Sequence, residues 1–142
     1  MKLKEVLDQK ASGVLSIDVS KSMQAAVQKM YDKRVGALLV ESETGEPVGI
    51  LSERDVLRFY AEQLGEADQV KVSEVMTQDF FVETLDSTTE HAESVMTEKR
   101  VRHLPVVNDG KIVGLISIGD LVKVKLDETV AEAKYLRDYI AS

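Results

Sequence analysis

The alternation of apolar and polar positions predicts the same order of strands and helices twice along the chain. Residues 13–19 and 79–85 each carry a short apolar run that is typical of a strand. Each run precedes a segment with apolar residues at i, i+3 and i+4 spacing, which predicts a helix with one buried face. Two apolar stretches joined by a turn, "SETGE" in the first half and "NDG" in the second, then predict a hairpin, and a further helix begins at Ser52 and at Ser117. Each half is therefore expected to form a β-α-β-β-α unit.

The two halves are copies of one repeat. A shift of 65 residues aligns "VGILSERDVL" (48–57) with "VGLISIGDLV" (113–122), and a shift of 66 residues aligns the segments before them. The prediction is an α+β (α/β) protein with a first repeat over residues 1–65, a second over 66–125 and a C-terminal helix over 126–142. The apolar stripe of that helix indicates packing on its own domain, with a contact between two copies as the alternative. The stripe consists of Leu126, Val130, Ala133, Leu136 and Ile140.

Composition narrows the classes of protein to consider. Of the 142 residues, 44% are hydrophobic and 30% are charged, which is the balance of a soluble globular protein. No apolar run reaches the ~18 residues that a bilayer span needs, and the first ten residues lack the apolar core of a signal peptide, so we expect a cytoplasmic protein without a membrane segment. The absence of cysteine excludes disulfides and a cysteine nucleophile. The net charge of −7 opposes binding to nucleic acid, which requires a basic face.

The repeated motif S-x-x-D allows two interpretations. Ser52 and Asp55, like Ser117 and Asp120, stand three residues apart at the expected start of a helix, which is the spacing of a capping box. Aspartate is shorter than the glutamate usual at the second position of the box, so it should reach back less well. The alternative is a binding site, because a helix N-terminus after a strand can bind phosphate and a nearby carboxylate can accept hydrogen bonds from both hydroxyls of a ribose. The glycine three residues before each serine lets another backbone or a ligand approach the strand closely.

These motifs resemble the G-h-h-S/T-x-x-D signature of CBS domains, the regulatory modules named after cystathionine β-synthase. The signature occurs twice in register, and "RVGALLV" and "RVRHLPVV" are similar to the second strand of the family. The resemblance covers nearly all of the chain, and "ILSERD" and "SIGD" are most similar to stand-alone bacterial proteins with two modules and no catalytic domain. It implies two CBS repeats packed through their sheets about a pseudo-two-fold axis, assembly into a flat homodimer, and clefts that bind adenine nucleotides.

The resemblance also implies which residues contact the nucleotide. The aspartate would hold the ribose diol, the serine would lie near the phosphates, and backbone groups and apolar side chains would contact the adenine. In the second repeat these residues are Thr77, Phe81, Arg102, His103, Leu104, Pro105, Ser117 and Asp120. In the first repeat they are Ala11, Leu15, Gly36, Ala37, Leu38, Ser52 and Asp55. Because the second set is the more polar and positively charged, we expect the Asp120 site to bind AMP more tightly than the Asp55 site.

Individual residues of these sites have alternative explanations. His103 is either a partly exposed histidine that enters a strand or a contact to the ligand. Arg54, in the first helical turn after Ser52, is either a solvated side chain or a clamp on the ligand phosphate. Pro105 has no backbone N–H to donate to a neighbouring strand. It should therefore begin its strand, or its nitrogen should face away from any partner strand. No metal site is expected, because cysteine is absent and the second histidine, His91, lies on a predicted helix.

The expected function is that of a sensor without catalytic activity. The sequence has no G-x-S-x-G motif and no Walker A motif. The resemblance implies that the ligand is AMP, with ATP, NAD(H) or S-adenosylmethionine as alternatives, and that its binding rearranges the CBS pair and signals to an unidentified protein partner. One alternative is a ligand-independent dimerisation module that docks on an enzyme or a transporter, in which both S-x-x-D motifs are only helix caps. A nucleotide-hydrolysing enzyme is the third hypothesis.

Overall fold

The chain forms two compact units that differ from the two sequence repeats. The computed structural model describes residues 1–10 and 13–141. One unit is Ser12–Phe81, and the other combines Val82–Ser142 with Met1–Ala11. The N-terminal segment of the first repeat therefore belongs to the unit of the second repeat, and the segment that opens the second repeat belongs to the unit of the first.

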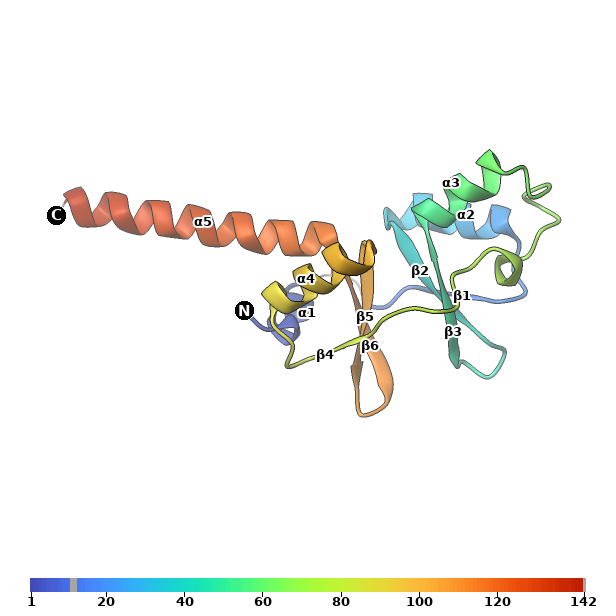
Figure 1. Cartoon of the computed structure of the whole chain (residues 1–142), viewed down its shortest axis with the longest axis horizontal. Coiled ribbons are helices and arrows are strands. Elements are labelled where there is room, and N and C mark those ends of the chain that lie inside the picture. Colours follow the sequence, from blue (N-terminus) through green and yellow to red (C-terminus); the bar gives the residue numbers. More distant parts are fainter. Residues whose placement is uncertain (11–12, 142) are drawn as a thin grey trace. The chain divides into compact units, whose positions relative to one another are not determined.

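The unit Ser12–Phe81 contains a three-stranded sheet in the order β1-β2-β3, with β1 parallel and β3 antiparallel to β2 (Figure 1). Apolar side chains of the strands and helices share one buried core, which includes Met23, Leu38, Leu51 and Phe59. Its elements are β1 (Ser16–Asp18), α2 (Met23–Lys33), β2 (Ala37–Glu41), β3 (Pro47–Ser52), α3 (Glu53–Ala61) and a 3-10 turn (Val72–Glu74).

The second unit repeats this topology with the order β4-β5-β6 and gains the N-terminal helix. Leu3 and Val6 of that helix lie in the same core as Leu104 and Ile116. The elements are α1 (Leu3–Gln9), β4 (Glu83–Thr84), α4 (Thr89–Lys99), β5 (His103–Asn108), β6 (Lys111–Ser117) and α5 (Ile118–Ala141). The predicted β-α-β-β-α order is confirmed in both halves, although the first strand of each is shorter than its apolar run.

Helices α2 and α4 begin in the same way. The hydroxyl of Ser22 accepts a hydrogen bond from the Ala25 N–H at 3.1 Å, and the hydroxyl of Thr88 accepts one from the His91 N–H at 3.1 Å. Each cap occupies one of the N–H groups that a helix N-terminus leaves without an intrahelical partner. The two caps lie at equivalent positions of the repeat, which explains why both helices start in the same register.

Pro105 lies inside β5 instead of at its start. It is the third residue of the strand and stands opposite Leu115 of β6. Strand β4 pairs with β5 only at Val106 and Val107, so Pro105 precedes that ladder. The proline is therefore accommodated where β5 has no β4 residue beside it.

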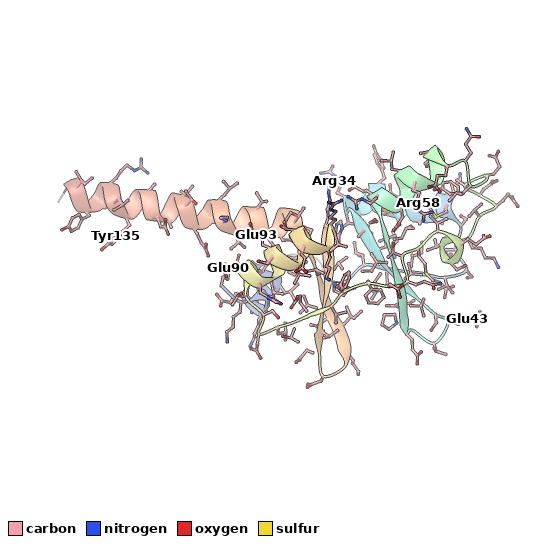
Figure 2. The ribbon with its side chains drawn as sticks, viewed as in Figure 1. Arg34, Glu43, Arg58, Glu90, Glu93 and Tyr135 are labelled. Carbon is pink, nitrogen blue, oxygen red and sulfur yellow. The ribbon has the colours of Figure 1, made fainter. Side chains whose placement is uncertain are left out.

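Helix α5 corrects two expectations about the C-terminal region. It is one continuous helix of 24 residues, because no proline and no glycine interrupts the sequence after its first turn. Only Leu121 and Val124 are buried, whereas the large side chains of the predicted stripe further along are exposed, from 57% at Leu136 to 81% at Ile140. The stripe therefore does not pack on its own unit, and α5 extends beyond α4 with Tyr135 far along it (Figures 1 and 2). No helix within residues 1–10 and 13–141 combines the length and the apolarity that a membrane crossing requires.

Candidate functional site

Both S-x-x-D motifs form capping boxes where a strand turns into a helix. The Ser52 N–H donates to Asp55 Oδ2 at 2.9 Å, and the Asp55 N–H donates back to the Ser52 hydroxyl at 3.4 Å. At the start of α5 the corresponding distances are 2.8 Å, from the Ser117 N–H to Asp120 Oδ2, and 3.1 Å, from the Asp120 N–H to the Ser117 hydroxyl. The expectation that aspartate reaches back poorly is therefore wrong, because its carboxylate satisfies the serine N–H in both halves.

The glycine of each signature makes room for the segment that packs across the sheet. A Cβ atom on Gly114 of β6 would lie 2.4 Å from Leu7 Cδ2 of α1. A Cβ atom on Gly49 of β3 would lie 2.7 Å from Met76 Sδ and 3.0 Å from the Thr77 carbonyl oxygen. Carbon atoms in contact normally stand 3.5–4.0 Å apart, so a larger residue at either position would displace the neighbour. The close approach expected at these glycines is confirmed, and in this structure the approaching group is another part of the chain.

The carboxylate of Asp55 is almost fully occupied by contacts within its unit. Besides the Ser52 N–H, its Oδ2 accepts from the Ser52 hydroxyl at 3.2 Å, and its Oδ1 accepts from the Thr77 hydroxyl at 3.1 Å. Arg58, which Figure 2 labels on α3, has its Nη2 atom 3.9 Å from Oδ1. The Asp55 side chain is only 9% exposed. Because an ionised carboxylate offers about four acceptor positions, Asp55 has little capacity left for a ligand.

The carboxylate of Asp120 has a different partner and is more open. Its Oδ2 accepts from the Ser117 N–H and from Lys10 Nζ, the latter at 2.9 Å. The Asp120 side chain is 22% exposed, against 9% for Asp55. Both of these hydrogen bonds reach the same oxygen, so the carboxylate of Asp120 has more acceptor capacity than that of Asp55 for the hydroxyls of a ribose.

Several predicted site residues surround these two carboxylates. The Gly36 carbonyl accepts from the Glu53 N–H at 3.0 Å, and the Arg102 carbonyl accepts from the Ile118 N–H at 2.9 Å, so both stand beside the first turn of a helix. In the same strand pairs, Ala37 lies opposite Ser52 and His103 lies opposite Ser117. The structure thus brings the strand ends and the helix starts together within each unit.

Other predicted site residues are placed differently. Thr77 and Phe81 belong to the unit of Asp55, because the segment before β4 pairs with β3 through Ile50 and Thr77. They therefore do not join Asp120 within its unit, as the repeat boundaries implied. The side chains of Ala37, Leu38, Leu104 and Pro105 are buried, Leu15 packs against the core of its unit, and Arg54 is exposed on α3. Ala11 lies outside the described residues.

Lys10 is the contact that sequence reasoning missed. It is separated from Asp120 by 110 positions in the chain, and no local motif connects the two. The only available signal was the start of the first repeat, where a lysine directly precedes the position that aligns with Thr77. Among residues 1–10 and 13–141, no group of three histidine, aspartate or glutamate side chains could hold a metal ion.

Comparison with known families identifies this arrangement. A family model described as "CBS domain" matches the chain twice, over residues 4–62 and 72–134. The chain belongs to the CBS-domain family. The two matches together cover most of the chain.

Known CBS proteins resemble the chain in sequence and in fold. The mitochondrial CBS domain-containing protein CBSX3 of Arabidopsis thaliana is 36% identical over 119 residues, which cover 81% of this chain and 58% of CBSX3. The chain thus spans less than two thirds of that relative. A putative signal-transduction protein with CBS domains from Burkholderia ambifaria MC40-6 matches with a TM-score of 0.85 and 33% identity, over 89% of this chain and 95% of that one.

Solved CBS structures with bound ligands include that of the CBS domain protein PAE2072 from Pyrobaculum aerophilum, which is complexed with AMP. It matches with a TM-score of 0.74 over 84% of this chain and 89% of that one. At 24% identity, the likeness shows that the two proteins share a fold.

Proposed function

We propose that the chain is a regulatory module that binds an adenine nucleotide, with AMP as the first candidate, and signals to a protein partner. The single observation that carries this proposal is the Asp120 carboxylate. It lies at the start of α5, is 22% exposed, and stands beside the strand end that carries Arg102 and His103.

The chemistry around Asp120 suits a nucleotide. A ribose diol presents two O–H donors, and an ionised carboxylate can accept both. A phosphate is favoured near a helix N-terminus and by cationic side chains. Lys10 supplies an ammonium donor at this turn, and the backbone of Arg102 and His103 lies beside it. The AMP complex of the P. aerophilum protein supports this choice of ligand, because that protein has the same fold.

The proposal is tested by a thermal shift with AMP. AMP is expected to raise the melting temperature of the parent protein, since a ligand that binds only the folded state stabilises it. Asp120→Ala should reduce this shift strongly, whereas Asp127→Ala, which removes the same charge from an exposed position of α5, should leave it unchanged. If Asp120→Ala lowers only the stability of the ligand-free protein and the shift with AMP persists, Asp120 is a helix cap and not a ribose ligand.

A second candidate function is favoured by the exposed stripe of α5. Four large apolar side chains on one helix, Leu126, Val130, Leu136 and Ile140, are each 57% exposed or more. Such a surface is typical of an interaction site. Under this alternative, the chain is an assembly module that dimerises and docks on an enzyme or a transporter without a ligand. The same thermal shift distinguishes the two, because an assembly module would show no stabilisation by AMP, ATP or NAD(H).

A further inference from the structure

We propose that Lys10 makes the Asp120 site selective for phosphorylated nucleotides over uncharged nucleosides. This inference rests on the proposed function, because it concerns the same carboxylate. Lys10 Nζ lies 2.9 Å from Asp120 Oδ2 and 2.7 Å from the Leu115 carbonyl oxygen. The side chains of Lys10 and Asp120 are 27% and 22% exposed, so the ion pair is partly shielded from solvent.

The position of Lys10 is set by helix α1. Lys10 is the residue that caps the C-terminus of α1, and its N–H donates to the Leu7 carbonyl at 3.1 Å. Leu3 and Val6 anchor the helix in the core, and Leu7 lies against Gly114 of β6. The packing of α1 on its unit therefore fixes the backbone of Lys10 at the point from which the ammonium group reaches Asp120.

The equivalent contact in the other unit is uncharged. Asp55 receives the Thr77 hydroxyl at 3.1 Å from the segment that packs over Gly49. In both units a segment crosses the sheet at the glycine of the signature and brings a side chain to the aspartate. That side chain is Lys10 at Asp120 and Thr77 at Asp55. The crossing segment therefore adds a positive charge at Asp120 and none at Asp55, whose cationic neighbour is Arg58 of its own helix, with Nη2 3.9 Å from Oδ1.

The positive charge of Lys10 has a different effect on a nucleoside and on a nucleotide that binds to Asp120. A ribose diol that spans both carboxylate oxygens of Asp120 uses Oδ2 as well as Oδ1, and so takes the place of Lys10 on Oδ2. A nucleoside brings only neutral hydroxyls, so this exchange leaves a partly buried ammonium without its counterion. Such an uncompensated charge is unfavourable. A nucleotide brings the ribose and an anion together, and its phosphate can take over the ammonium through a charge-assisted hydrogen bond. Lys10 therefore opposes nucleoside binding and favours nucleotide binding at one and the same site.

The test compares AMP with adenosine at the Asp120 site alone. Two-dimensional ¹H–¹⁵N NMR titrations are followed at the amide of Gly119, which lies in the first turn of α5 next to Asp120. Lys10→Met should bind adenosine about tenfold more tightly than the parent does. It should bind AMP no more tightly than the parent does, so the preference for AMP over adenosine should fall by at least about tenfold. Lys10→Gln should give the same result, while Lys10→Arg, which keeps the charge, should retain the preference.

The control variant is Lys125→Met. It removes the same charge from the same unit, but at an exposed side chain that stands 3.8 Å from Glu93. Its preference for AMP should equal that of the parent. If Lys10→Met and Lys10→Gln keep the parental preference while AMP still binds, the role of Lys10 is refuted and the proposed function survives. If the parent binds neither ligand, both proposals are refuted.

Discussion

Gly114→Ala should destabilise the unit that contains β6, because α1 packs directly against this position. The new Cβ atom would lie 2.4 Å from Leu7 Cδ2 and 2.6 Å from Leu7 Cδ1. Normal carbon contacts are 3.5–4.0 Å, so the Leu7 side chain must retreat by roughly 1 Å. Overpacking of this kind typically costs about 1–3 kcal/mol, which corresponds to a melting temperature lower by roughly 5–20 °C in a domain of this size.

Urea denaturation followed by circular dichroism measures the loss in the free energy of unfolding. The control is Gly13→Ala, where no atom lies within 4 Å of the added methyl group, and it should change stability by at most about 1 kcal/mol. A double-mutant cycle with Leu7→Ala then isolates the contact, and the two substitutions should be coupled by at least about 0.5 kcal/mol. Strict additivity, or a parental stability of Gly114→Ala, would refute the proposed reason for the glycine.

Three further predictions concern the ligand, the helix caps and the assembly. Asp120→Ala should weaken AMP binding by about 10–100-fold in calorimetry, because a charge-assisted hydrogen bond is lost, and an unchanged affinity would count against a ribose contact. Thr88→Ala should cost roughly 1 kcal/mol in chemical denaturation through loss of the α4 cap, whereas no loss would contradict the capping geometry. The chain should sediment as a homodimer at micromolar concentration, because the stripe of α5 and an open groove of about 840 Å³ between α2 and α3 expose apolar side chains, and a single species of 15.7 kDa would contradict this.

The local structure could be predicted because local patterns determine it. The period of apolar residues identified α2 and α4, and the turn sequences identified both hairpins. The repeat also showed that the two halves share one topology. The two S-x-x-D motifs were correctly placed at helix starts, but the hydrogen-bond geometry of Asp55 and Asp120 needed coordinates.

The exchange of segments between the units could not be predicted from these patterns. Residues 72–77 and helix α1 each pack on a sheet far away in sequence, and periodicity carries no information about which sheet is chosen. For this reason Thr77 was grouped with the second repeat, although its hydroxyl donates to Asp55, and Lys10 was overlooked. The continuity of α5, in contrast, was available in the sequence, because no helix-breaking residue follows Gly119 before the C-terminus.

The two carboxylates differ in their partners and in their exposure, which is the structural basis for expecting unequal sites. Asp55 accepts from the Thr77 hydroxyl, has Arg58 Nη2 at 3.9 Å and is nearly buried, while Asp120 has the Lys10 ammonium at 2.9 Å and is more open. A phosphate-bearing ligand should therefore occupy the Asp120 site first. Calorimetry with AMP should resolve one tight site per chain, and two equal sites would contradict the argument.

Native mass spectrometry of the purified chain with added AMP tests the central claim most directly. It reports whether an adenine nucleotide binds, how many molecules bind to each chain, and whether binding depends on one side chain. The account predicts one tightly held AMP per chain, which is lost in Asp120→Ala and retained in Asp127→Ala. Spectra that show no bound AMP at concentrations up to the millimolar range, or an equal amount of AMP on Asp120→Ala, would contradict it.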